Sequence, residues 1–149
     1  MKYAVSACLL GENCKYSGGN NYNEKLCKYL EGHEVISVCP EVTGGLPIPR
    51  MPFELVDGIA VNKAGENVHQ QVMTGAKACI DLLKDENIDC VILQPRSPSC
   101  GVGRIYDGTF SGKLTDGNGL FVQELLKNGF KVVSADVFTE NPDKKTAGK

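Results

Sequence analysis

Three cysteines stand where an apolar, strand-like segment of the chain ends. Cys8 and Cys39 directly follow such segments, and Cys100 comes a few residues after the apolar residues 91–93. In an open parallel sheet, the carboxyl ends of the strands lie along one edge, which is where such sheets bind ligands. We therefore expect these thiols to converge, as the ligands of a metal ion or a cluster must.

The other four of the seven cysteines have simpler interpretations. Cys27 and Cys79 lie at helical core spacing and Cys90 opens a buried-strand pattern, so we expect these three side chains to be buried. Cys14 lies in a polar stretch close to Cys8, and the pattern does not assign it. The odd cysteine count and the lack of an export signal argue against a disulfide framework.

The spacing of the thiols along the chain limits which kind of metal or redox site they could form. A structural zinc site usually takes four Cys or His ligands, commonly in C-x-x-C spacing, which is missing here; His33 and His69 lie outside the cysteine-bearing loops. A thioredoxin-like reaction also needs C-x-x-C. Cys thiolates hold iron–sulfur clusters, and a 4Fe-4S cluster with three protein ligands would leave one iron open for catalysis. The alternative is that all the thiols are buried and unrelated.

The elements that must position these thiols alternate between strand and helix. The segment 89–94 is almost continuously apolar, as expected for a strand covered on both faces. The sequence therefore predicts a single α/β domain over residues 1–140, with a mostly parallel, Rossmann-like sheet flanked by helices and the cysteine-bearing loops at the carboxyl ends of the strands. Residues 141–149 predict a flexible polar tail. The predicted strands are 2–7, 34–38, 89–94 and 130–134, and the predicted helices are 24–31, 66–84 and 119–127.

The composition of the 149 residues is ordinary for a globular protein, with 42% hydrophobic and 23% charged residues. A net charge of -2 and scattered basic residues argue against a nucleic-acid surface. No apolar run approaches the roughly 20 residues that span a bilayer. The chain enters a strand pattern at once, without a signal peptide, so we expect a cytoplasmic protein whose partner is a small molecule.

The loops that follow the strands contain motifs typical of one family. Over nearly its full length, the chain resembles the cytoplasmic family known as domain of unknown function 523, which includes thiouracil desulfidases. The motifs that carry the resemblance are Ser6-Ala7-Cys8-Leu9-Leu10-Gly11, then Cys39-Pro40-Glu41 with Gly44-Gly45-Leu46-Pro47 and Pro49-Arg50, and finally Ser97-Pro98-Ser99-Cys100-Gly101 with Ile105-Tyr106-Asp107-Gly108-Thr109-Phe110.

The resemblance implies both a cofactor and a reaction. The cofactor is a 4Fe-4S cluster bound by three cysteines, which would be Cys8, Cys39 and Cys100. The reaction removes sulfur from a thiolated pyrimidine, with the substrate sulfur passing to the iron that has no protein ligand.

The resemblance also implies a catalytic acidic residue and a catalytic serine near the cluster. Glu41 matches the acid, and the serine is Ser97 or Ser99. Replacing C=S by C=O requires water at the ring carbon and a proton delivered to the substrate, which suits a carboxylate acting as general acid and base. A serine hydroxyl can orient the water. The simpler alternatives are a carboxylate that binds loop N–H groups and serines that form turns beside proline.

Other polar side chains in these loops have two equally good interpretations. Arg50, Arg104 and Tyr106, with Arg96, are predicted either to bind a substrate edge or an anion, or to form salt bridges that hold the loops. The first loop departs from the family pattern of a basic residue, Tyr, Asp and Gly, since it reads Lys15-Tyr16-Ser17-Gly18. A hydroxyl thus replaces a carboxylate at the expected substrate wall.

A non-catalytic function would use the same ligands. The protein would then be a sulfide carrier, or an iron–sulfur protein that binds a ligand through its glycine-rich loops. Sulfide release from a thiolated base that depends on Glu41 would distinguish the enzyme from the carrier.

Overall fold

The computed structural model describes residues 1–140, so the predicted flexible tail at 141–149 lies outside the described residues. A central sheet has four parallel strands in the order β2-β1-β5-β8. This arrangement confirms the predicted α/β fold with a mostly parallel sheet. Its strands are β1 (Lys2–Ser6), β2 (Glu34–Val38), β5 (Cys90–Leu93) and β8 (Val132–Ser134).

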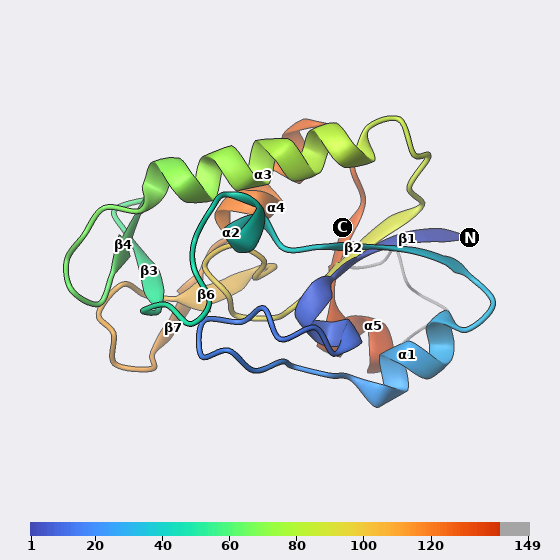
Figure 1. Ribbon diagram of the computed structural model, residues 1–149, viewed down its shortest axis with the longest axis horizontal. Helices are drawn as coiled ribbons and strands as arrows, with labels where there is room; N and C mark the ends of the chain where they lie inside the picture. The colour runs from blue at the N-terminus through green and yellow to red at the C-terminus, as the bar shows by residue number, and fades with distance from the viewer. Residues whose placement is uncertain (141–149) are drawn as a thin grey trace.

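Helices cover both faces of this sheet (Figure 1). Helices α3 (His69–Leu83) and α4 (Leu120–Lys127) pack on one face, and α1 (Glu24–Leu30) and α5 (Ala135–Glu140) pack on the other. Each helix directs an apolar stripe inward, so the sheet is buried between two cores. The buried helical residues include Ala76, Ile80, Leu83, Phe121 and Leu125 on the first face, and Leu26, Leu30 and Phe138 on the second.

Helix α3 begins at His69, three residues later than its apolar spacing predicts. The preceding residues are bonded to a strand instead, because the N–H of Asn62 donates to the oxygen of Glu66 (2.9 Å) and the N–H of Val68 donates to that of Ala60 (2.9 Å). These bonds hold the chain in a turn up to the first helical residue.

Two antiparallel hairpins that the sequence analysis did not predict lie together at the end of the molecule away from the N-terminus (Figure 1). They are β3 (Phe53–Val56) with β4 (Ile59–Asn62), and β6 (Arg104–Tyr106) with β7 (Leu114–Asp116). The 3-10 helix η1 (Ala7–Leu10), the short helix α2 (Pro40–Thr43) and helix α5 were also not predicted.

The cysteines expected in the core behave differently from one another. Cys79 and Cys90 are buried, as predicted, with 2% and 1% of their surface exposed. The prediction for Cys27 is wrong, because this residue is half-buried. Leu26 and Leu30 take the inward positions of α1, and Cys27 lies at the edge, where its thiol donates to the carbonyl oxygen of Leu9 (3.7 Å).

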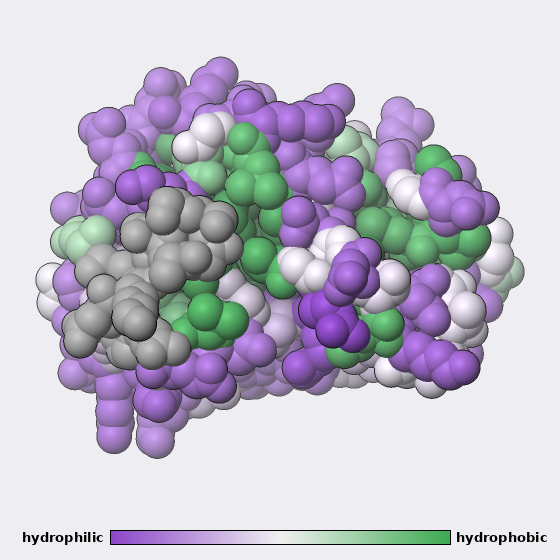
Figure 2. All heavy atoms as spheres, turned by 180° about the vertical axis from the view of Figure 1, so that it is seen from behind, coloured by the Kyte–Doolittle hydropathy of each residue, from purple (hydrophilic) through white to green (hydrophobic). Residues whose placement is uncertain are grey.

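The molecular surface is mixed in character. Seen from behind, hydrophilic residues dominate, with a column of hydrophobic residues near the middle and a second group at the end where the hairpins lie (Figure 2). Across residues 1–140, no helix combines the length and the apolar character that crossing a membrane requires.

Candidate functional site

A cavity of about 500 Å³ opens at the carboxyl ends of β1, β2 and β5. Cys8, Cys39 and Cys100 all line it, so the structure brings together the three thiols that the strand ends single out. A fourth thiol, that of Cys14, lines the same cavity. This volume lies in the usual range for small-molecule sites.

Cys8 lies in η1, the 3-10 segment that turns the chain away from β1. Gly11 ends this segment in the left-handed conformation, at φ 98°, which glycine adopts without steric cost. The carbonyl oxygen of Cys8 accepts a hydrogen bond from the N–H of Asn21 (3.0 Å), so the long first loop folds back over the thiol.

Cys39 is the N-cap residue of α2, and Pro40 occupies the first helical position. Two glycines bring the backbone of α2 against that of α3. A Cβ atom on Gly75 would lie 1.7 Å from the oxygen of Pro40, and one on Gly44 would lie 2.0 Å from the oxygen of Gln71. Because only hydrogen fits at these positions, α3 fixes where α2 holds Cys39 and Glu41.

Cys100 lies in a tight turn after β5. The hydroxyl of Ser97 accepts hydrogen bonds from the N–H groups of Ser99 and Cys100, both at 3.1 Å. Helix α4 supports this turn, since the N–H of Phe121 donates to the oxygen of Ser99 (3.0 Å) and a Cβ atom on Gly119 would lie 2.4 Å from that oxygen. The close packing leaves Cys100 only 7% exposed.

The thiols influence one another's ionisation. Hydrogen bonding with Cys14 lowers the pKa of Cys8 to about 7 and also lowers the pKa of Cys39. The same contacts raise the pKa of Cys14, so among these three thiols it is Cys14 that keeps its proton. Burial, followed by the negative charge of Glu41, raises the pKa of Cys100. Thiolates are the form that binds metals, so the lowered pKa values favour the metal-binding form of Cys8 and Cys39.

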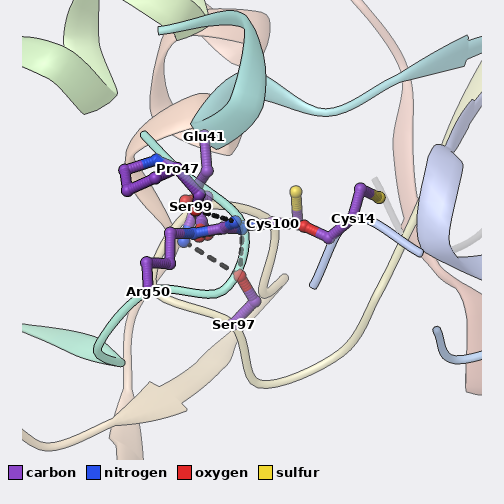
Figure 3. Close-up of polar contacts among 7 residues, drawn as sticks. All are labelled: Cys14, Glu41, Pro47, Arg50, Ser97, Ser99 and Cys100. Carbon is purple, nitrogen blue, oxygen red and sulfur yellow. Dashed lines mark hydrogen bonds and ion pairs between the residues drawn. The ribbon is translucent and has the colours of Figure 1, made fainter. Parts of the chain in front are cut away.

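The carboxylate of Glu41 is held from both sides (Figure 3). Its Oε2 accepts a hydrogen bond from the hydroxyl of Ser99 (2.7 Å), and its Oε1 accepts from Nε (3.1 Å) and Nη2 (2.9 Å) of Arg50. With 16% of the Glu41 side chain and 6% of the Arg50 side chain exposed, this ion pair is shielded from water. Glu41 is therefore oriented toward the cavity that the thiols line.

Arg50 also connects separate loops. Its Nη2 donates to the carbonyl oxygen of Cys14 (2.9 Å) and its Nη1 to that of Pro47 (3.0 Å), while its own N–H donates to the oxygen of Tyr16 (2.7 Å). Most of its side-chain donors are thus used within the protein. Of the two sequence interpretations, the geometry favours a residue that holds the loops over one that binds substrate.

The remaining predicted site residues differ in whether they line the cavity. Ser97 lines the cavity, and its hydroxyl accepts from the N–H groups of the turn. Ser99 is fully buried, does not line the cavity, and donates to Glu41 from behind it. Tyr106 lines the cavity, as does Arg96. Arg104 does not line it. Its side chain is 59% exposed and forms a 3.7 Å ion pair with Asp116, because it sits on β6 facing its hairpin partner β7.

The sequence analysis missed Glu54 of β3, a carboxylate that also lines the cavity and is only 8% exposed. Its Oε1 accepts hydrogen bonds from the N–H groups of Gly108 (2.9 Å) and Phe110 (3.1 Å). Glu54 therefore anchors the loop that brings Phe110 to the cavity wall. The signal that would have found it is a charged residue at an inward position of a hairpin strand.

The donor set fits an iron–sulfur cluster. Four thiols share one cavity, and two of them have lowered pKa values, which is the chemistry that cluster ligation needs. Among residues 1–140, no group of three or more His, Cys, Asp or Glu side chains is arranged to hold a single metal ion. In a cluster, by contrast, each protein thiolate binds a different iron.

The fold and the cavity define a class of α/β proteins in which thiols from three strand ends meet at one edge of the sheet. A family model described as 2-thiouracil desulfurase matches residues 4–137, and the chain belongs to that family. It is 38% identical over 140 residues to the uncharacterized protein YbbK of Bacillus subtilis (strain 168), covering 87% of this chain and 93% of that protein. A solved structure of the [4Fe-4S]-dependent thiouracil desulfidase TudS superposes with a TM-score of 0.87, at 36% identity and 96% coverage of both chains.

Proposed function

We propose that this protein is a 4Fe-4S-dependent desulfidase that removes sulfur from a thiolated pyrimidine. The observation that carries the proposal is the single cavity shared by Cys8, Cys39, Cys100 and the oriented carboxylate of Glu41. Family membership and the similarity to TudS support it. We place the protein in the cytoplasm, where the thiols that line the cavity would stay reduced.

Cys8, Cys39 and Cys100 would hold the cluster. When bound there, the cluster supplies an iron without a protein ligand, a Lewis acid that attracts the substrate's sulfur. The net reaction exchanges C=S for C=O: the oxygen comes from water, and both protons of that water leave with the sulfur as hydrogen sulfide.

Glu41 would take a proton from the attacking water and return it to the leaving sulfur. This role requires a carboxylate fixed at the cavity, and the two contacts from the Arg50 guanidinium hold it there. Ser99 is fully buried outside the cavity lining, and its hydroxyl, 2.7 Å from Glu41 Oε2, would hold that carboxylate in place. Ser97 lines the cavity and would orient the water, in addition to supporting the Cys100 turn. We assign Arg50 to the positioning of Glu41 and Tyr106 to the substrate wall.

The experiment is anaerobic reconstitution followed by metal analysis and turnover of 2-thiouracil. We expect about four irons per chain in the wild type, with iron lost in Cys8→Ala, Cys39→Ala and Cys100→Ala. Cys27→Ala is the matched control, since this half-buried thiol does not line the cavity. Retained iron in the first three variants would contradict the ligand assignment.

Glu41→Gln distinguishes the enzyme from a sulfide carrier. The amide keeps an oxygen that can accept from Arg50 or Ser99 but cannot take a proton from water, so we expect normal iron content and turnover reduced at least 100-fold. A reconstituted protein that binds sulfide, and in which Glu41→Gln leaves the release of sulfide from 2-thiouracil unchanged, would support the carrier.

A further inference from the structure

Cys14 is a thiol in the cavity that the proposed reaction does not use. It is 8% exposed, it lines the cavity with Cys8, Cys39 and Cys100, and its side chain hydrogen-bonds with those of Cys8 and Cys39. A buried thiol that touches two proposed ligands is positioned to act on a cluster held there.

The backbone fixes where this thiol lies. The N–H of Cys14 donates to the oxygen of Glu12 (2.9 Å), and the carbonyl oxygen of Cys14 accepts from Nη2 of Arg50 (2.9 Å). Arg50 also binds Glu41, so one side chain sets the positions of the fourth thiol and of the proposed proton carrier (Figure 3).

The neighbours of Cys14 decide between two roles. The negative charge of Glu41 acts on Cys8, Cys39 and Cys100, which places this carboxylate near the whole ligand set. The side chain of Cys14 contacts those of Cys8 and Cys39, two of the three proposed ligands. Because Cys8, Cys39 and Cys100 are proposed to hold the cluster, Cys14 is left to act on the sulfurs of the two ligands that it contacts.

We propose that Cys14 is a positioning residue that donates its S–H to the ligand sulfur of Cys8 or Cys39 and raises the reduction potential of the cluster. This inference rests on the proposed cluster. A hydrogen bond to a ligand sulfur draws electron density away from iron and favours the reduced cluster, as is general for such sites. The open iron also becomes a better acceptor for sulfur.

The test compares anaerobically reconstituted wild type, Cys14→Ala, Cys14→Ser and Cys27→Ala by iron content and by spectroelectrochemical titration of the cluster. We expect equal iron in all four proteins, as well as a more negative midpoint potential in Cys14→Ala. The hydroxyl of Cys14→Ser should restore part of the difference, and Cys27→Ala should match the wild type. Circular dichroism verifies that each variant is folded.

Two results would overturn the inference. Iron loss in Cys14→Ala as large as in Cys8→Ala would make Cys14 a ligand, and a full iron content with an unchanged potential would show that it makes no bond to the ligand sulfurs. Failure of the proposed function would look different, because Cys8→Ala, Cys39→Ala and Cys100→Ala would then keep their iron.

Discussion

Replacing Gly75 by alanine tests how α3 positions the site. A Cβ atom at this residue would lie 1.7 Å from the carbonyl oxygen of Pro40, which is half of the 3.4 Å at which ordinary contacts begin. It would also lie 2.7 Å from the N of Gly44. Both neighbours are backbone atoms, so no side-chain rotation can relieve the clash, and α2 must move away from α3.

Two opposing contributions set how far Gly75→Ala changes the free energy of unfolding. Alanine in a helix interior is favoured over glycine by about 1 kcal/mol. Overpacking usually costs about 1–3 kcal/mol, and more where rigid backbone must shift. Because this clash involves backbone on both sides, we expect an overpacking cost of at least about 3 kcal/mol. Subtracting the helix preference for alanine leaves a fall of at least about 2 kcal/mol in the free energy of unfolding.

The assay is urea unfolding of the apo-protein, followed by circular dichroism, since a bound cofactor complicates a two-state transition. Lys77→Ala is the control, as Lys77 is exposed on the same helix, and its change should stay within about 0.5 kcal/mol. After reconstitution, Gly75→Ala should hold less iron, because Cys39 moves with α2. A variant as stable as the wild type or more stable, with full iron content, would refute the close backbone packing.

Three further substitutions address the polar network of the site. Arg50→Lys keeps the charge but not the planar set of donors, so we expect about 1–3 kcal/mol less stability in urea unfolding and lower turnover. Wild-type values for both would show that Arg50 does not hold Glu41 and the loops in place. Glu54→Gln keeps one carbonyl acceptor but loses the charge, which should cost about 1 kcal/mol and speed amide hydrogen exchange at Gly108 and Phe110; unchanged exchange would show that Glu54 does not anchor this loop. Arg104→Ala removes an exposed ion pair and should leave turnover of 2-thiouracil unchanged. A large loss of turnover would show that Arg104 takes part in substrate binding or catalysis.

The convergence of the thiols was predictable because it depends on topology. Parallel strands end at one edge, so cysteines just after β1, β2 and β5 share that edge, and they lie near one another because these three strands are neighbours in the sheet. Their positions after apolar segments singled out Cys8, Cys39 and Cys100 among seven cysteines, and the loop motifs with the family resemblance predicted that the three form one ligand set.

The hairpins were harder to predict, although one had a recognisable signal. Asp57 and Gly58 have φ values of 51° and 81°, the paired positive angles of a two-residue hairpin turn, and Asp-Gly is a common sequence for it. The flanking strands have only four residues each, too few for a clear alternation. The strands of the second hairpin have three residues each, which is shorter still.

The choice between Ser97 and Ser99 could not be made from the sequence, since both lie within two residues of a proline near Cys100. The structure gives the two side chains different surroundings: the Ser97 hydroxyl accepts from backbone N–H groups of the turn at the cavity wall, and the buried Ser99 hydroxyl donates to Glu41. That last contact joins residues 58 positions apart, so it depends on how two loops meet.

Glu41 has an architectural function as well as the proposed chemical one. Through Arg50 it is joined to the loop that carries Cys14, and through Ser99 to the turn that carries Cys100. Glu41→Ala would therefore lose activity even if the carboxylate never touched a proton, because it leaves the buried guanidinium unpaired. Glu41→Gln keeps the shape and part of the hydrogen bonding but not the basicity. The difference in turnover between these two variants, measured at equal iron content, separates proton transfer from support of the loops.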